Sequence, residues 1–429
     1  MIQWTIVEDT RCYTRIIKNP LEYQATIQTT FYSKTILISV LSVPEMSSKT
    51  EASQNVPPTP SEILTSYFDF PSKDQEKWWQ ETGHLFGRFL GATGYNVHAQ
   101  YQHLLFFLKH LVPALGPYPS SWRSTITPTG LPIEFSLNFQ KDTRPLARIG
   151  FEPLSHFSGT AEDPYNKIAV GDLLNQLTKV QLHDFDTQLF THFTNDFSLS
   201  RKEINALQKQ GGISGGNTVR TLAAFGFDLK DGEIAVKGYA FAGLKHKATG
   251  IPMGQLISES MHKLDANMRC WEAFSILNEY MEGSDGWNEY SFVSWDCVDI
   301  DRSRLKLYGV HTGVTWKRIK EMWILGGRLE GSPTIMEGLK LLEHMWSLLQ
   351  IGEGDRSYKG GFAADDGGKT TPIIWNYELH GGCPHPVPKF YFPVHGENDL
   401  RVVECISDFF IFLGWEDHAK QYPTLLRQF

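Results

Sequence analysis

The sequence has few cysteines, and they form no pattern typical of a metal site or a disulfide framework. The five cysteines are widely spaced along 429 residues, are odd in number and include no Cys-x-x-Cys pair. Such usage is typical of a reducing compartment, in which thiols pack as small hydrophobic groups. We therefore expect a cytoplasmic protein.

The chain also lacks a long apolar run and an excess of positive charge. The longest apolar run near the start, TILISVLSVP at 35–44, is too short to span a bilayer and follows too many mixed residues to resemble a signal peptide. A net charge of −8 argues against nucleic acid or an anionic membrane as partner. We expect a monomer or homodimer that binds small molecules.

The first sixty residues differ from the rest of the chain. Their start shows no clear periodicity, and MSSKTEASQNVPPTPSE at 46–62 is rich in proline, serine and other polar residues, as linkers are. We predict an N-terminal extension over 1–60, possibly disordered, and a folded domain over 61–429.

Within that domain, two helical segments and two strands alternate in a regular order. The expected helical regions are 74–90, 98–115, 170–200, 252–282, 315–325, 332–350 and a last one from residue 398. The expected strand pairs are 131–139 with 145–152, 224–230 with 233–241, 290–299 with 303–310, and 372–380 with 388–394. Asp231-Gly232 between two alternating runs is a strong hairpin signal.

The order helix–strand–strand–helix, repeated four times, excludes the parallel sheets of Rossmann and TIM folds. It favours an α+β fold in which an antiparallel barrel is surrounded by helices. The apolar strand faces would then lie under the helices, and the polar faces would line a lumen.

Basic and aromatic residues recur on the polar strand faces. Lys-x-Tyr occurs on the later strand of three hairpins, as KGY, KLY and KFY. By the two-residue period of a strand, the residues that fall on the polar faces are Arg148, Lys237, Tyr239, Arg304, Lys306, Tyr308, Lys389 and Tyr391. Buried cations require an anion, and diphosphate suits lysine and arginine. Tyrosine rings stabilise a cation, so the pattern indicates ionisation of an allylic diphosphate to a carbocation.

Glu134 lies on the polar face of the strand in TGLPIEFSLNF (129–139). A buried carboxylate there could accept a hydrogen bond from the N–H or O–H of an electron-rich aromatic acceptor and raise its nucleophilicity. The alternative is a carboxylate that only pairs with a nearby arginine such as Arg148. Alternation alone leaves both interpretations open.

No metal site is expected. Asp365-Asp366 is followed by Gly-Gly-Lys, which lacks the aspartate-rich spacing that holds Mg²⁺ on a diphosphate. His380, Cys383 and His385 lie in a tight Gly/Pro connection without a second ligand pair. Basic side chains would then take the place of a metal, with no cofactor besides the diphosphate co-substrate.

Several motifs resemble those of the fungal aromatic (indole) prenyltransferases of the dimethylallyltryptophan synthase type. They are ALGPYP (114–119), TGLPIEFS (129–136), RIG (148–150), SGTAEDPYN (158–166), DLK…VKGY (228–239), RSRLKLY (302–308), PKFYFP (388–393) and LGW (413–415). The spelling around 114–166 is most similar to enzymes that act on tryptophan-containing cyclic dipeptides. The resemblance implies a barrel of αββα repeats (the ABBA, or PT, barrel) and metal-independent transfer of a dimethylallyl group from dimethylallyl diphosphate to an indole in alkaloid secondary metabolism.

The resemblance also implies roles for individual residues. The glutamate that bonds the indole N–H falls on Glu134, the diphosphate-binding residues on Arg148, Lys237, Arg304, Lys306 and Lys389, and the tyrosine shield on Tyr239, Tyr308 and Tyr391. In the family's shield strand, Phe241 replaces a second tyrosine.

The family continues beyond LGW into a strand pair that closes the barrel, whereas this chain ends at Phe429. We therefore expect a C-terminally truncated barrel that lacks its last hairpin. A truncated barrel would leave an inactive remnant that only binds ligands as one alternative to the indole prenyltransferase. The other alternative is the same transfer to a phenolic or polyketide ring, whose O–H Glu134 could also bind.

Overall fold

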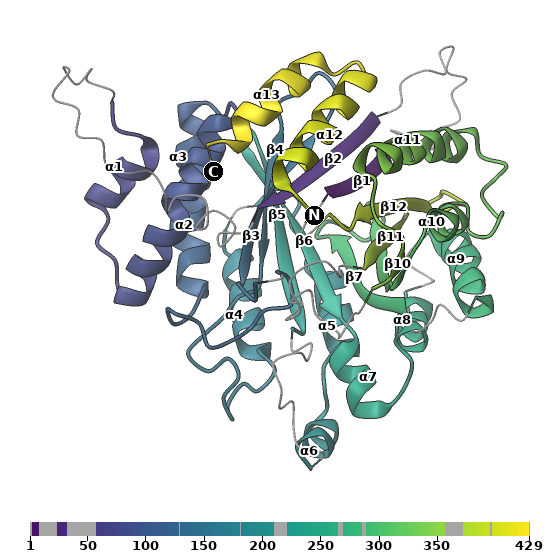
Figure 1. The fold of residues 1–429 in the computed structure, drawn as a ribbon. Helices are drawn as coiled ribbons and strands as arrows, with labels where there is room; N and C mark the ends of the chain where they lie inside the picture. Colours follow the sequence, from purple (N-terminus) through teal and green to yellow (C-terminus); the bar gives the residue numbers. More distant parts are fainter. Residues whose placement is uncertain are drawn as a thin grey trace.

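In the computed structural model, the described residues are 2–7, 24–31, 57–127, 129–180, 182–209, 221–264, 269–284, 289–356, 372–394 and 397–428. Figure 1 shows a central barrel with helices around it. The strands are β1 (Ile2–Val7), β2 (Gln24–Phe31), β3 (Ile133–Phe139), β4 (Leu146–Phe151), β5 (Ala223–Lys230), β6 (Glu233–Phe241), β7 (Tyr290–Asp296), β8 (Leu305–His311), β9 (Gly313–Val314), β10 (Gly354–Asp355), β11 (Ile373–Leu379) and β12 (Val387–Phe392). The α-helices are α1 (Pro60–Tyr67), α2 (Lys73–Ala92), α3 (Val97–Phe106), α4 (Lys167–Leu177), α5 (Gln188–Phe197), α6 (Arg201–Lys209), α7 (Gly243–Thr249), α8 (Met253–His262), α9 (Trp271–Gly283), α10 (Trp316–Trp323), α11 (Pro333–Leu349), α12 (Asp399–Phe412) and α13 (Glu416–Leu426).

Ten of the described strands form one closed antiparallel barrel, which confirms the predicted fold class, and β9 and β10 form a separate two-stranded sheet. The strand order of the barrel is β1-β12-β11-β8-β7-β6-β5-β4-β3-β2, and every neighbouring pair runs antiparallel. The four hairpins predicted from the alternating pattern are all present, and helices connect them in the expected αββα order.

The apolar faces of the strands point outward and pack under the helices. On β3, Phe135 stacks on Phe86 of α2 at a ring-centroid distance of 5.1 Å, and Phe139 contacts Phe410 of α12 at 5.3 Å. On β5, Phe225 stacks on Phe190 of α5 at 4.6 Å. Because a buried aromatic ring contributes about 1.5–3 kcal/mol, these layers hold the barrel together and leave its polar faces for the lumen.

The barrel is not missing its last hairpin. Residues from the first part of the chain fill that place, because β1 pairs with β12 and β2 pairs with β3. This corrects the expectation of an open barrel and of an N-terminal segment that stands apart from it. The signal was present, since IQWTIV and QATIQTTF both alternate, but sixteen residues separate them in the sequence, so no two-residue turn signal marks a hairpin. Most of the predicted linker lies outside the described residues.

The register of β2 against β3 can be tested by cross-linking. Thr30 is directly opposite Ser136, and opposed strand positions lie close enough for a disulfide. We expect the double substitution Thr30→Cys and Ser136→Cys to give an oxidised species that migrates differently on a non-reducing gel, whereas Thr30→Cys alone gives none. Absence of the cross-link under oxidation would contradict the closure of the barrel by β2.

Candidate active site

A cavity of about 610 Å³ occupies the lumen of the barrel. All nine residues singled out in the sequence line this one cavity, although they come from four different hairpins: Glu134, Arg148, Lys237, Tyr239, Arg304, Lys306, Tyr308, Lys389 and Tyr391. Eight of them converge because each lies on the strand face opposite the helix-covered one, and Arg304 directly precedes β8.

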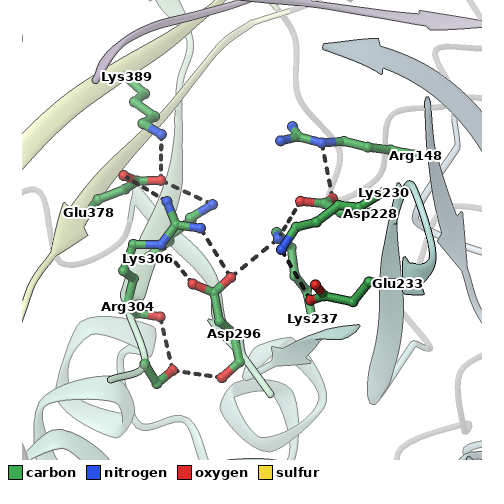
Figure 2. Close-up of polar contacts among 11 residues, drawn as sticks. Arg148, Asp228, Lys230, Glu233, Lys237, Asp296, Arg304, Lys306, Glu378 and Lys389 are labelled. Carbon is green, nitrogen blue, oxygen red and sulfur yellow. Dashed lines mark hydrogen bonds and ion pairs between the residues drawn. The ribbon is translucent and has the colours of Figure 1, made fainter. Parts of the chain in front are cut away.

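The five basic residues do not stand alone in the lumen. Asp228, Asp296 and Glu378 lie between them and form a continuous series of ion pairs, which Figure 2 shows. We call this series the charged belt: Arg148, Asp228, Lys237, Asp296, Arg304, Glu378, Lys306 and Lys389. With Lys389 protonated, its five cations and three carboxylates leave two positive charges in excess (5 − 3 = 2).

The contacts of the charged belt are short. Asp228 binds Arg148 Nε at 3.0 Å and Lys237 Nζ at 2.7 Å, and Asp296 contacts Lys237 Nζ at 3.3 Å. Asp296 also accepts two hydrogen bonds from Arg304, at 2.7 and 3.2 Å.

Glu378 ends the belt. It contacts Lys306 at 3.0 Å and Arg304 at 3.8 Å, and it also binds Lys389. Only 1% of its side chain is exposed, so its charge is neutralised by these cations and not by water.

The three carboxylates were missed at the level of the sequence. Each lies on the earlier strand of a hairpin, directly opposite a cation on the later strand of the preceding hairpin. The register pairs are Arg148 with Asp228, Lys237 with Asp296, and Lys306 with Glu378. The signal becomes visible only when neighbouring hairpins are aligned with one another.

The belt keeps its carboxylates ionised. Burial alone would raise the pKa of Asp228 and of Asp296, but the adjacent cations lower both values to well below the usual range. The same balance lowers the pKa of Glu378. Burial lowers the pKa of Lys389 to about 7, with Lys306 and Arg304 adding to the effect and Glu378 opposing it. An anion bound beside Lys389 would therefore favour its charged form.

Aromatic rings form a wall next to the belt. Phe292 stacks on Tyr308 at 4.2 Å and contacts Phe241 at 5.0 Å and Tyr239 at 6.2 Å. The hydroxyl of Tyr391 donates to that of Tyr308 at 3.4 Å. We call these five residues the aromatic wall. Burial raises the pKa of all three tyrosines, so they are neutral phenols.

Phe241 occupies a lumen position beside Phe292 and completes the wall with a ring that lacks a hydroxyl. Phe292 itself, together with Ala224, Val310 and Ile374, was not expected from the sequence. These residues make the wall apolar at its edge, as a site for a hydrocarbon group requires.

Glu134 faces the lumen from β3. Among the described residues it makes no hydrogen bond or ion pair, and Arg148, its alternative partner, is bound to Asp228 instead. Its side chain is partly exposed to the lumen, and its location inside the barrel raises its pKa to about 7 through desolvation.

Two glycines keep the space beside Glu134 open. Gly150 is opposite Glu134, and Gly226 is opposite both Gly150 and Lys237. A Cβ at Gly150 would lie 2.7 Å from Cγ of Glu134, and one at Gly226 would lie 3.0 Å from Cε2 of Tyr239. The carboxylate and the aromatic wall therefore border a common empty space.

Glu152, a buried carboxyl group outside the charged belt, fixes one rim of the cavity. It accepts hydrogen bonds from Ser124, from Thr221 at 3.0 Å and from Asn166 at 3.3 Å, and burial raises its pKa to about 7. Thr221 in turn accepts from the backbone N–H of Thr125, which lines the cavity. Glu152 thus holds a loop at the lumen without facing it.

The described residues include neither a membrane-spanning helix nor a cluster of metal ligands. No helix there has the length and apolar character needed to cross a membrane. In that same part of the chain, no group of three or more His, Cys, Asp or Glu residues is placed to hold a metal ion.

Comparisons with known proteins identify the class to which this barrel belongs. Residues 74–424 match the family model of tryptophan dimethylallyltransferase. The chain belongs to this family, and it is an aromatic prenyltransferase.

Named relatives are similar over most of their length. The reverse prenyltransferase criA of Aspergillus cristatus is 72% identical over 384 residues, which cover 89% of this chain and 89% of criA. The deoxybrevianamide E synthase notF of an Aspergillus species (strain MF297-2) is 53% identical over 377 residues, which cover 86% of this chain and 83% of notF.

Solved structures agree with this result. The structure of NotF in complex with brevianamide F and DMSPP has a TM-score of 0.78 and 51% identity, and it covers 86% of this chain and 90% of NotF. The structure of AnaPT from Neosartorya fischeri has a TM-score of 0.75 and 30% identity, and the match covers 86% of this chain and 88% of AnaPT. The barrel is therefore the ABBA barrel of this family.

Proposed function

We propose that this protein transfers a dimethylallyl group from dimethylallyl diphosphate to the indole ring of a tryptophan-containing cyclic dipeptide. The observation that carries the proposal is the lumen, in which a belt with two excess positive charges, an aromatic wall and one carboxylate without a partner among the described residues border one cavity. The relatives at 72% and 53% identity, and the complex of NotF with brevianamide F, support the choice of acceptor.

In this proposal the charged belt binds the diphosphate. Arg148, Lys237, Arg304, Lys306 and Lys389 contribute N–H donors, which match phosphate oxygens in charge and geometry. As the C–O bond breaks, the electron pair leaves with pyrophosphate and the belt stabilises the added negative charge. The cations supply this charge, so the step requires no metal.

The allyl cation that remains lies against the aromatic wall. Tyr239, Tyr308 and Tyr391 present π-faces that attract it, each by about 0.5–2 kcal/mol when water is excluded. The same rings exclude water, which would otherwise capture the cation as an alcohol.

Glu134 accepts a hydrogen bond from the indole N–H. Its negative charge raises the nucleophilicity of the ring and orients it toward the cation. The indole carbon that forms the new C–C bond then loses its proton, which Glu134 accepts directly or through a relay. In this proposal the acceptor occupies the space beside Gly150 and Gly226, between Glu134 and the aromatic wall, and the short distances that a Cβ would have there support it.

Incubation of the enzyme with dimethylallyl diphosphate and a panel of cyclic dipeptides, free tryptophan and phenols tests the proposal. We expect prenylated cyclic dipeptide, formed equally well in EDTA. A product found only on phenols would favour the alternative acceptor class, and loss of product in EDTA would contradict the metal-free mechanism. Hydrolysed prenyl alcohol as the sole product would show that the lumen admits water.

The pH dependence of kcat/KM for the acceptor should show the ionisation of Glu134. Because its pKa is raised to about 7, the carboxylate forms as the pH rises through that value, and only the carboxylate strengthens the indole N–H bond. We expect kcat/KM for the acceptor, at saturating donor, to increase between roughly pH 6 and pH 8. Glu134→Gln should lack this increase, and a flat profile in the unmodified enzyme would contradict the assignment.

A further inference from the structure

We propose that Asp228, Asp296 and Glu378 are positioning residues that limit the affinity of the charged belt for pyrophosphate, so that the product can leave. This inference rests on the proposed function, in which the belt binds the diphosphate. It gives the three carboxylates a role distinct from that of the cations.

Each carboxylate lies between at least two cations. Asp228 joins Arg148 to Lys237, and Asp296 joins Lys237 to Arg304. Lysine and arginine side chains are long, and these fixed anions hold their charged ends at set places around the lumen (Figure 2). The geometry of the empty site is therefore prepared before the diphosphate arrives.

The repeat is broken at one position. Three later strands carry a cation that is opposite a carboxylate, but Lys389 on β12 is opposite Thr5 on β1. Lys306, Lys389 and Arg304 therefore share the single carboxylate of Glu378. Asp296 binds Arg304 more closely than Glu378 does, so Lys306 on β8 and Lys389 on β12 share Glu378 and leave one excess positive charge beside the aromatic wall. The geometry points to this side of the lumen as the place of the diphosphate.

The count of charges has a kinetic consequence. The belt must attract the leaving group most strongly in the transition state and then release it. Five uncompensated cations in a buried site would bind a multiply charged anion far more tightly than two. The three carboxylates offset three of these cations and leave an excess of two positive charges, which is less than the negative charge of a diphosphate near neutral pH.

Asp296→Asn tests this role. The substitution keeps the shape of the side chain but raises the excess from two to three positive charges. We expect the dissociation constant of inorganic pyrophosphate, measured by titration calorimetry in EDTA, to fall at least about tenfold. Product inhibition should tighten in parallel, and kcat should fall because release becomes slower, while a single turnover is affected less.

Three comparisons make the result specific. Asp296→Glu keeps the charge and should not tighten pyrophosphate binding, and Asp228→Asn should repeat the effect of Asp296→Asn at a second position. Asp184→Asn removes a carboxylate paired with Arg302 outside the lumen and should change nothing.

The proposal is wrong if neither Asp296→Asn nor Asp228→Asn binds pyrophosphate more tightly than the unmodified enzyme, whether affinity is unchanged or the belt collapses. Failure of the unmodified enzyme to bind pyrophosphate would be a different result. It would contradict the diphosphate site itself and so the proposed function.

Discussion

Glu134→Gln is expected to reduce kcat/KM for the acceptor by about 100-fold or more, which corresponds to about 2.7 kcal/mol. Glutamine keeps the size of the side chain and can still accept from the indole N–H, but it carries no negative charge to activate the ring. Because no charged group of the belt contacts Glu134, pyrophosphate affinity should stay unchanged. Steady-state kinetics with a cyclic dipeptide and calorimetry with pyrophosphate measure the two effects separately.

Glu337→Gln is the matched control for this substitution. Glu337 pairs with Lys340 at 2.9 Å on α11, and neither residue lines the lumen. Its replacement should leave both measurements unchanged. Full activity in the Glu134→Gln enzyme would remove the role given to this carboxylate.

Lys306→Met is expected to weaken pyrophosphate binding by about 100-fold and to raise KM for dimethylallyl diphosphate. The belt then has one excess positive charge where it had two, so the anion loses a close buried cation. The fold should survive, since Glu378 keeps Lys389 and Arg304 as partners. Calorimetry gives the affinity, and a thermal melt checks that the variant is folded.

Lys245→Met serves as the control, because Lys245 lies on α7 and pairs with Glu203 at 2.9 Å outside the lumen. It removes the same charge from the chain without touching the belt. Equal pyrophosphate affinity in the unmodified enzyme, the Lys306→Met variant and the Lys245→Met variant would contradict the assignment of the diphosphate to Lys306 and its neighbours.

Much of the barrel could be predicted because its strands alternate so regularly. Phe135 and Phe225 face helices while Glu134 and Gly226 face the lumen, and this period of two is visible in any single hairpin. The closing pair β1 and β2 escaped prediction for a physical reason. Residues 8–23 separate its two strands in the sequence, so no two-residue turn signal marks a hairpin there, and their partners β12 and β3 lie more than 380 and more than 100 residues away.

The site shows the same division between local and non-local information. Lys237 and Tyr239 could be found because the spacing Lys-x-Tyr lies within one strand and recurs in another, as Lys306 and Tyr308. Asp296 could not be found in this way, because its pairing with Lys237 depends on the register between β6 and β7. A single aspartate on the polar face of a strand forms no distinctive sequence pattern. Phe292 was missed likewise, because its role comes from stacking on Tyr308 across two strands.

The account as a whole depends on where the two substrates lie in the lumen. A crystal structure with an unreactive thiolodiphosphate analogue and a tryptophan-containing cyclic dipeptide would test this most directly. We predict phosphate oxygens within hydrogen-bond distance of Lys306 and Lys389, the prenyl chain against Tyr239 and Tyr308, and the indole N–H on Glu134. A diphosphate bound away from the charged belt, or an indole N–H that faces any group other than Glu134, would contradict it.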